Sequence, residues 1–432
     1  MVRRGRDFDE DDIRVRANPR GSRPRTRQRP VHEDAAEAMV VAVDRGRYTC
    51  LILPQDSRAD RPAMADDHEV TAMKARELGR KGVVVGDRVS IVGDLRGGPD
   101  SLARVVRVHP RTHVLRRTAD DTDPEERVIV ANADQLIIVT ALADPEPRPR
   151  MIDRCLVAAF EAGLTPVLCL TKADLADPGP LLAAYAPLGV DAVVTERGSD
   201  LTELRKLLSG RVSVLVGHSG VGKSTLVNAL VPDADRAIGR VNDVTGRGRH
   251  TSTSAVALRM PPTRVTPKRT SATPEAADAP PIPSAAPAIP AKKRRRKRAD
   301  AATDDSWHQP ILFNDDDLDR LLERDGAAAG GSEGADGPEE DVELPGGWVI
   351  DTPGVRSFGL AHVSPDGVIA AFPDLAAVTA ECPRGCTHAA DAPDCNLDEW
   401  LASLPDDSSE KSVAAARIDS IRRLLAAMAD RP

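Results

Sequence analysis

The chain has 432 residues, of which 41% are hydrophobic, 29% charged and only 2% aromatic, and its formal net charge is −8. This length exceeds one ordinary domain, so two or three domains are expected, with cores of Val, Leu, Ile and Ala. The charged residues 1–12 lack the apolar centre of a secretory signal. No stretch approaches the roughly 18 apolar residues of a membrane span. We therefore expect a cytoplasmic protein with no membrane partner.

The negative net charge hides a segregated pattern of basic and acidic segments. Residues 3–29 contain ten arginines, and residues 292–298 read KKRRRKR. Acidic residues gather elsewhere, for example at 315–317 and 339–341. Basic segments can hold a phosphate backbone whatever the total charge, so nucleic acid is not excluded as a partner. The alternative, that each run is only a solvated tail or loop, stays open.

The N-terminal third predicts a basic disordered tail followed by a small β-barrel. Residues 1–36 lack periodicity. Short strand patterns then follow, and we assign an OB-type β-barrel to residues 37–118. Tyr48 is the one aromatic residue of this range, so any RNA contact there must rely on basic side chains. The predicted strands are 39–44, 48–53, 87–94 and 103–109, and the basic candidates are Lys74, Arg76, Arg80 and Lys81.

Buried strands and amphipathic helices alternate after residue 125, which predicts a parallel sheet with crossover helices. We assign residues 125–365 to this α/β domain and residues 261–346 to a low-complexity, disordered insertion within it, with a short helical pattern at 315–324. Residues 366–432 form a small C-terminal module that ends in a helix over 412–429. The predicted strands are 128–132, 135–142, 165–175, 190–195, 211–217 and 348–354, and the helices are 153–163, 180–189, 201–210 and 223–230.

A phosphate-binding loop follows the strand at 211–217. Its sequence GHSGVGKS fits GxxxxGK[ST], with a hydrophobic strand before it and a helix after it. The loop N–H groups would face the phosphates, the lysine would add positive charge, and the serine hydroxyl would bind Mg²⁺. The candidate nucleotide-binding residues are Gly217, His218, Ser219, Gly220, Val221, Gly222, Lys223, Ser224 and Thr225.

The tetrapeptide Thr171, Lys172, Ala173 and Asp174 follows the buried strand at 165–170. It is similar to the guanine-specificity motif of GTPases, Asn-Lys-x-Asp, with Thr171 in place of Asn. An aspartate accepts two hydrogen bonds from the N1–H and N2–H₂ edge of guanine, which adenine cannot supply. Together with the phosphate-binding loop, this motif favours GTP over ATP.

The sequence Asp351-Thr352-Pro353-Gly354 resembles the DxxG element that senses the γ-phosphate. Asp351 would act through water on Mg²⁺, and the Gly354 N–H would face the γ-phosphate. Standard GTPases run from phosphate-binding loop through DxxG to the guanine motif. Here the guanine motif comes first, so the motifs are circularly permuted, which is physically allowed where the original termini lie close together.

The segment GRHTST at 248–253 lies between the phosphate-binding loop and the DxxG element. Thr251 is our first candidate to close over Mg²⁺, with Thr253 as its competitor. Val355 occupies the position that follows the DxxG glycine, where Ras-like proteins carry a water-orienting Gln. His250 is the nearest polar candidate for that role, and the alternative that it is a solvated loop histidine stays open.

Four potential metal ligands cluster near the C-terminus: Cys382, Cys386, His388 and Cys395. Three thiolates and one imidazole suit tetrahedral Zn²⁺, and a full protein ligand set implies one structural site. The remaining cysteines, Cys50, Cys155 and Cys169, lie in apolar surroundings and are predicted to be small buried hydrophobic residues.

The motifs together resemble the RsgA (YjeQ) family of ribosome small subunit-dependent GTPases. The resemblance covers roughly residues 37–260 and 347–430 and includes ANADQ (131–135), IDR (152–154) and DTPGVRSFGL (351–360). Three features depart from the family pattern: Thr171, a one-residue shift in the zinc-ligand spacing on each side of Cys386-x-His388, and the insertion at 261–346.

The resemblance implies a role in late maturation of the small ribosomal subunit. It implies binding to the 30S particle through 16S rRNA, GTP hydrolysis that is slow alone and faster on the subunit, release afterwards, and a catalytic role for His250. We expect a monomer that uses GTP/GDP with Mg²⁺. One alternative is an RNA-binding assembly scaffold that uses GTP only as a binding switch. The other is an ATP-dependent P-loop enzyme.

Overall fold

The computed structural model describes residues 32, 34–44, 46–53, 68–79, 82–98, 101–118, 126–232, 234, 255–265, 342–352 and 363–429. The predicted basic tail lies almost wholly outside these residues, as do the KKRRRKR run and the helical pattern at 315–324. Among the described residues, no helix is both long and apolar enough to cross a membrane.

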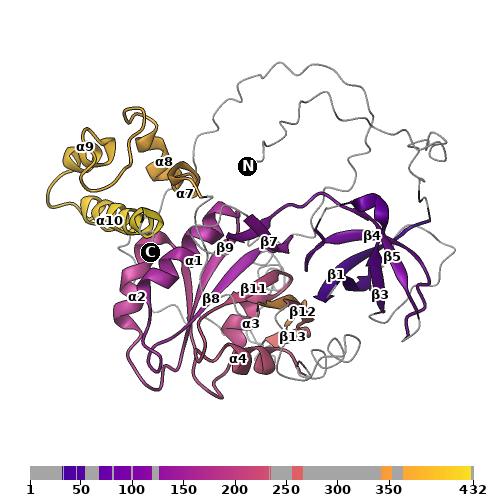
Figure 1. Ribbon diagram of the computed structural model, residues 1–432. Helices are drawn as coiled ribbons and strands as arrows, with labels where there is room; N and C mark the ends of the chain where they lie inside the picture. The colour runs from indigo at the N-terminus through magenta and orange to yellow at the C-terminus, as the bar shows by residue number, and fades with distance from the viewer. Residues whose placement is uncertain are drawn as a thin grey trace, which may run out of the picture. The chain divides into compact units, whose positions relative to one another are not determined.

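The N-terminal part is a closed five-stranded barrel, indigo and violet in Figure 1. β1 pairs with both β2 and β4, and β3 pairs in parallel with β5, which gives the cyclic order β1-β2-β3-β5-β4 of an OB-type barrel. Alternate residues of β1 point inward to an apolar core that includes Val40, Val89 and Ile91. The bounds are β1 Ala36–Asp44, β2 Arg47–Ile52, β3 Glu69–Lys74, β4 Arg88–Gly93 and β5 Ala103–Val108.

The central part is a mainly parallel sheet in the order β10-β9-β8-β11-β15-β12, and this confirms the predicted α/β fold. A single pair, Ala42 opposite Val256, continues the sheet from β12 to β1. Every residue of β8 is buried, as expected for a strand covered on both faces. The strands are β8 Gln135–Ala141, β9 Thr165–Thr171, β10 Asp191–Val194, β11 Val212–Val216, β12 Val256–Arg259 and β15 Trp348–Asp351. The helices between them are α1 Pro149–Glu161, α2 Gly179–Tyr185, α3 Thr202–Leu208 and α4 Lys223–Leu230, with a 3₁₀ turn, η3, at Ala186–Leu188.

The strand order reverses between β8 and β11. β9 and β10 extend the sheet on one side of β8, and the chain then returns to place β11 on the other side. Ligands of open α/β sheets bind at the carboxyl ends of the strands beside such a reversal. The fold therefore places a binding edge where the loops after β8, β9, β11 and β15 meet.

One predicted strand pairs differently in the structure. The strand predicted at 128–132 is not in the parallel sheet: β7 (Glu126–Ala131) pairs antiparallel with β6 (Val114–Thr118), which falls within the range predicted for the barrel. Only three residues separate β7 from β8, whereas a parallel neighbour needs a crossover of about a dozen residues or more.

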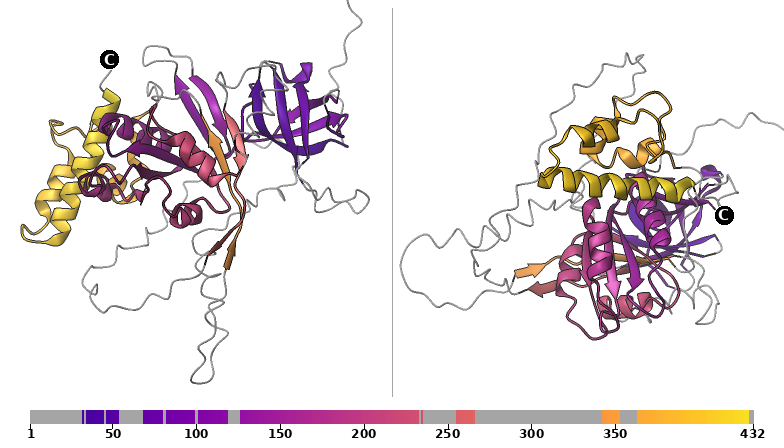
Figure 2. Two further views of the ribbon diagram at one scale, coloured as in Figure 1. Left: turned by 90° about the horizontal axis from the view of Figure 1, so that it is seen from below. Right: turned by 90° about the vertical axis from the view of Figure 1, so that its left-hand side faces the viewer.

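The ends of the predicted disordered insertion are also ordered. β13 (Thr263–Val265) pairs antiparallel with β14 (Val342–Leu344), so the described ends of 261–346 form a ribbon that runs on from β12 and β15. Figure 2 shows this ribbon running on from the sheet. β13 follows β12 and β14 precedes β15 along the chain. Because β12 and β15 are antiparallel neighbours, β13 and β14 lie side by side and continue that pairing.

The C-terminal part is helical, and its last helix packs on the α/β domain. α10 contacts α1 and η3, and Figure 1 shows it beside α1 and α2. Phe160 of α1 meets Phe372 edge-to-face with ring centroids 4.8 Å apart, and such pairs add to the burial of the rings. The predicted C-terminal helix is confirmed. The bounds are α7 Pro365–Ile369, α8 Pro373–Thr379, α9 Asn396–Ser403 and α10 Ser409–Ala429.

Candidate nucleotide site and metal centre

The phosphate-binding loop connects β11 to α4, as its sequence predicts. Gly222 precedes α4 with a φ of 90°, a left-handed backbone conformation that residues other than glycine rarely adopt. A Cβ on Gly217 would lie 2.5 Å from the carbonyl oxygen of Val139 in β8, so the loop can leave β11 at this point only with glycine. Both glycines are needed for the path of the loop at the reversal between β8 and β11.

Lys223 of this loop reaches the end of β15. Its Nζ lies 3.0 Å from Oδ1 of Asp351 and donates to the Thr352 carbonyl at 3.2 Å. The Thr352 hydroxyl donates in turn to the carbonyl of Leu215 in β11, 2.8 Å away. The γ-phosphate element and the phosphate-binding loop, predicted from segments far apart in the chain, therefore meet at one edge of the sheet.

The carboxylate of Asp351 has an atom suited to a magnesium-bound water. Its buried Oδ1 lies 3.0 Å from the Lys223 ammonium, and no other described residue donates a hydrogen bond to it. The hydroxyl of Ser224 is exposed in the first turn of α4. Mg²⁺ prefers such oxygen groups and keeps several of its waters when bound to protein. The residues present fit this ion.

The guanine motif is tied to the phosphate-binding loop by its first residue. Oγ1 of Thr171 donates to the carbonyl of Val221 at 2.6 Å and lies 3.3 Å from the carbonyl of Thr140. Lys172 has a positive φ of 58°, and its ammonium contacts the carbonyl of Asp144 in the loop after β8. Asp174 is exposed at the start of the following turn. The Thr171 hydroxyl therefore links the two loops at the position where the usual motif carries an Asn side-chain amide.

The sequence predicts a further guanine-contacting loop near residues 194–200 but assigns none of its residues, and the structure places Thr195 of this segment beside the guanine motif. The Thr195 carbonyl accepts a hydrogen bond from the Ala173 N–H at 3.2 Å, and the Thr195 N–H donates to the Leu170 carbonyl at 2.7 Å. The segment follows β10, which pairs with β9.

The loop after β8 supplies another contact that sequence reasoning missed. A guanidinium N–H of Arg148 donates to Nε2 of His218 at 3.1 Å, and Nδ1 of the same ring lies 3.0 Å from the Ser219 carbonyl. Arginine has no acceptor, so Nε2 must accept and Nδ1 must carry the proton. His218 therefore joins Arg148 to the backbone of the phosphate-binding loop.

Three predicted site residues lie outside the described part of the chain. They are His250, Thr251 and Gly354. Thr225 lies next to Ser224 in the first turn of α4 and is exposed. The structure thus brings together the predicted residues of β9, β11, α4 and β15.

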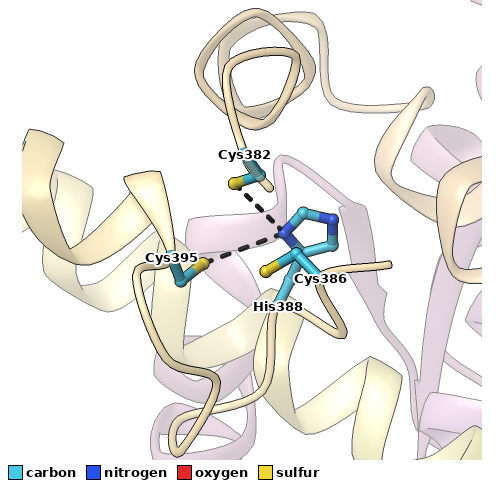
Figure 3. A group of neighbouring side chains, drawn as sticks. All are labelled: Cys382, Cys386, His388 and Cys395. Atoms are coloured by element: carbon cyan, nitrogen blue, oxygen red, sulfur yellow. Dashed lines mark hydrogen bonds between the residues drawn. The ribbon is translucent and has the colours of Figure 1, made fainter. Parts of the chain in front are cut away.

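The four predicted metal ligands converge in the C-terminal part, as Figure 3 shows. Nδ1 of His388 lies 3.6 Å from Sγ of Cys382 and 3.8 Å from Sγ of Cys395, and the four ligand atoms, including Sγ of Cys386, all lie within 4.8 Å of one another. Tetrahedral bond lengths to zinc place nitrogen and sulfur ligands about 3.5 Å apart. The cluster is consistent with zinc.

The surroundings of the cluster act in opposite directions on its two kinds of ligand. Burial lowers the pKa of His388, which favours the neutral imidazole that binds metals. Burial, together with the neighbouring thiols, raises the pKa of the Cys382 thiol to about 11 against the effect of the Asn396 N–H, and this rise disfavours the free thiolate. A bound cation offsets this crowding of sulfurs, since metal ligation deprotonates a thiol. Arg422 of α10 donates to the His388 carbonyl at 3.3 Å and so ties the cluster to α10.

Comparisons with known proteins agree on one family. A family model described as RsgA GTPase matches residues 108–265. "Small ribosomal subunit biogenesis GTPase RsgA" of Ectopseudomonas mendocina is 30% identical over 416 residues, covering 87% of this chain and 94% of that protein. The protein of the same description from Pseudomonas syringae pv. tomato is 39% identical over 211 residues, covering 45% of this chain. The match spans only 60% of that relative's length.

The fold also matches a solved structure. The crystal structure of YjeQ from Thermotoga maritima aligns with a TM-score of 0.51 at 20% identity, covering 92% of this chain and all of that one. At this level of identity the likeness supports the fold described above: barrel, α/β domain and C-terminal helical part.

Proposed function

Because the chain belongs to the RsgA family of small ribosomal subunit biogenesis GTPases, we propose that it binds and hydrolyses GTP on the 30S subunit during late subunit maturation. It acts as a cytoplasmic monomer, contacts 16S rRNA, and hydrolyses GTP slowly until the particle stimulates it. After hydrolysis, GDP stays in the site until the protein releases it.

One observation carries the nucleotide part of this proposal. Thr171, Lys223 and Asp351 come from three separated segments, yet contacts of 2.6 and 3.0 Å join their loops at the sheet edge where α/β proteins bind ligands. Lys223 pairs with Asp351, so the fold holds its ammonium at the sheet edge where the motif expects the β- and γ-phosphates.

We assign the remaining nucleotide contacts by motif. Asp174 accepts the two guanine N–H groups, Lys172 and Ala173 complete that loop, and the backbone of 217–225 surrounds the phosphates. Ser224, Thr251 and waters held by Asp351 would bind Mg²⁺, which would neutralise charge on the β- and γ-phosphates. The Gly354 N–H donates to the γ-phosphate.

His250 is the residue we assign to the attacking water. Val355 follows the DxxG glycine and carries no group that can orient water or accept a proton. An imidazole can do either near neutral pH. The proposed step is attack of water on the γ-phosphorus, with departure of GDP and transfer of the water proton to His250 or to the phosphate product.

The C-terminal cluster holds one structural Zn²⁺ through Cys382, Cys386, His388 and Cys395. A set of four protein ligands leaves no position for a substrate, which separates a structural site from a catalytic one. We assign residues 37–118 to the barrel, 125–365 to the GTPase domain and 366–432 to the zinc-binding module.

The barrel is the proposed first contact with rRNA, through basic side chains. Its single aromatic residue, Tyr48, is 7% exposed and packs in the barrel core, so it offers no ring to a stacked base. Lys74 lies on β3 and Arg76 follows it on the surface, while Arg80 and Lys81 lie outside the described residues.

Base selectivity tests the nucleotide assignment. We expect GTP to displace a fluorescent GDP analogue at least a hundredfold more effectively than ATP does, since a site built for hydrogen bonds to one base rejects the other strongly. Asp174→Asn should remove most of that preference, and Asp177→Asn, an exposed carboxylate three residues further on, should keep it. Equal displacement by ATP and GTP would favour the ATP-dependent alternative.

A further inference from the structure

The segment ANADQ at 131–135, which spans the connection from β7 to β8, has no part in the nucleotide site or the metal centre described so far. We call it the junction segment. Its polar side chains make hydrogen bonds in two directions: Asn132 bonds to the loop before β4 of the barrel, and Asp134 bonds to the first residue of β11. The junction segment therefore joins the barrel to the strand that leads into the phosphate-binding loop.

Asn132 uses both ends of its side-chain amide. Its Nδ2 donates to the carbonyl of Gly86 at 2.9 Å, and its Oδ1 accepts from the N–H of Thr112 at 2.9 Å and from the Thr112 hydroxyl at 3.3 Å. The φ of Asn132 is 54°, a left-handed conformation that Asn adopts more readily than most residues with a side chain. This side chain bridges the loop before β4 and the connection from β5 to β6.

The loop before β4 fits closely against the junction segment. Gly86 has a φ of 87°, and a Cβ on it would clash with the carbonyl oxygen of Ala131, so only glycine fits here. The Gly86 N–H donates to the Val40 carbonyl of β1 at 2.8 Å, and the Ala131 N–H donates to the Val85 carbonyl at 3.0 Å. Backbone groups therefore tie this loop to the barrel on one side and to the junction segment on the other.

Asp134 makes the bonds on the α/β side. Its Oδ2 accepts from the N–H of Val212 at 2.7 Å, and its own N–H donates to the Val212 carbonyl at 2.8 Å. Val212 is the first residue of β11, and the phosphate-binding loop begins directly after Val216, the last residue of that strand. Only Ala133 separates Asp134 from Asn132, so the bonds to the barrel and to β11 come from almost the same point of the chain.

Apolar contacts hold the barrel against the α/β domain without fixing its rotation. Val41, Leu51 and Val85 of the barrel belong to the same buried cluster as Val130 and Leu136. Hydrophobic contact is non-directional, whereas a hydrogen bond weakens steeply when its angle changes. The hydrogen bonds of the junction segment therefore select one orientation of the barrel.

We propose that Asn132 is a positioning residue for GTP hydrolysis on the 30S subunit. It holds the barrel in the orientation from which a bound subunit acts on the phosphate-binding loop through Asp134 and β11. The proposal rests on the proposed function, since it names a residue through which the subunit reaches the nucleotide site. A subunit on the barrel shifts the nucleotide loops only if it binds their two conformations unequally, and a barrel that rotates freely binds equally well in both.

The distance between two dyes tests the positioning role without any ribosomal component. A donor and an acceptor are attached in place of Glu69 of β3 and Asp191 of β10, which are both exposed. We expect a narrow distance distribution in otherwise unchanged protein and a broadened one in Asn132→Gly, which permits the left-handed backbone and removes the amide. The control is Lys206→Gln on α3, which breaks an exposed contact with Glu203 and should leave the distribution unchanged. Equal distributions for Asn132→Gly and its parent would overturn the proposal.

Single-turnover GTP hydrolysis, with and without saturating 30S subunits, tests the link to the reaction. We expect Asn132→Gly alone to hydrolyse GTP within about twofold of wild type and to lose about fivefold or more of the stimulation, since the directional bonds to the barrel are removed. Asn132→Asp keeps the acceptor for Thr112 and lacks the donor to Gly86, so it should lose stimulation as well. An equal loss of hydrolysis with and without the subunit would overturn the proposal.

Failure of this proposal differs from failure of the proposed function. Wild-type protein whose hydrolysis does not rise on 30S subunits would contradict the proposed function, and the dye distances would still decide whether Asn132 sets the orientation of the barrel. Wild-type stimulation that Asn132→Gly and Asn132→Asp both retain in full would contradict the role of Asn132 alone.

Discussion

The hydroxyl of Thr171 donates to the carbonyl of Val221 at 2.6 Å, so the guanine motif and the phosphate-binding loop are joined by a single short side chain. Both residues are buried, with Thr171 7% and Val221 2% exposed. The link fixes the position of Lys172 and Asp174 relative to the phosphate-binding loop.

Removing this hydroxyl should weaken nucleotide binding. Thr171→Val leaves the Val221 carbonyl without its donor, so we expect GDP affinity to fall about five- to tenfold, equivalent to about 1–1.4 kcal/mol. Fluorescent GDP titration measures this. Thr171→Ser keeps the donor and is the control, and equal losses for the two variants would mean that the hydrogen bond has no role.

Replacing His250 separates hydrolysis from binding. We expect His250→Ala to lower turnover by about a hundredfold or more while GTP affinity stays within about twofold, since general acid–base groups contribute rate rather than binding. Single-turnover hydrolysis and GTP titration give the two values. Ser252→Ala, at a neighbouring position with no assigned role, is the control. Unchanged turnover in His250→Ala would favour the scaffold that uses GTP only as a binding switch.

Zinc removal should unfold the C-terminal module selectively. We expect one zinc per purified chain, and its loss in Cys386→Ser, because structural zinc contributes about 10–16 kcal/mol of apparent binding free energy. Metal analysis and limited proteolysis of residues 366–429 measure the two effects. Cys169→Ala changes a buried thiol of β9 away from the cluster and should retain the metal. A zinc-free protein with an intact module would contradict the assignment.

The ion pair between α1 and α10 should have a marked effect on stability. Asp153 is 3% exposed, and its Oδ1 lies 3.2 Å from Nε of Arg423. Arg423→Gln leaves a buried carboxylate unpaired and should lower the free energy of unfolding by about 3 kcal/mol. Lys206→Gln, which breaks an exposed pair, should cost less than about 1 kcal/mol. Urea unfolding gives both values.

The same variant should change how stability depends on pH. Burial raises the pKa of Asp153, and Arg423 opposes this rise, while the Tyr185 hydroxyl also faces the carboxyl. A carboxyl whose folded pKa is raised loses stability as pH increases from its unfolded pKa, about 3.9, through its folded value. Without Arg423 that loss extends to higher pH, so Arg423→Gln should be less stable at pH 7 than at pH 5. Asp153→Asn added to Arg423→Gln should remove this difference.

The sequence predicted the elements that carry strong local patterns. The glycines around Lys223, the buried strand before Thr171 and the spacing of Cys382 to Cys395 each reflect a local requirement, and the structure places these residues where the motifs require. β3 was missed because its sequence, EVTAMK, has only two strongly apolar residues and its parallel pairing with β5 is not local.

Long-range contacts could not be read from local patterns. Asp153 and Arg423 are separated by 270 residues, and Arg148 and His218 by 70, so only the fold brings each pair together. The segment 126–131 has a buried-strand composition, and pairing with β6 rather than the parallel sheet depends on the short connection to β8. The loop at 195–200 carries no distinct motif, and its place beside the guanine motif follows from the pairing of β10 with β9.

GTP hydrolysis measured with and without purified 30S subunits decides whether the protein is a subunit-dependent GTPase. We expect slow release of phosphate by the protein alone, a rise of tenfold or more on adding 30S subunits (about 1.4 kcal/mol in the barrier), and neither with Lys223→Ala. A rate that is unchanged by 30S subunits, or a rise that persists in Lys223→Ala, would contradict this expectation.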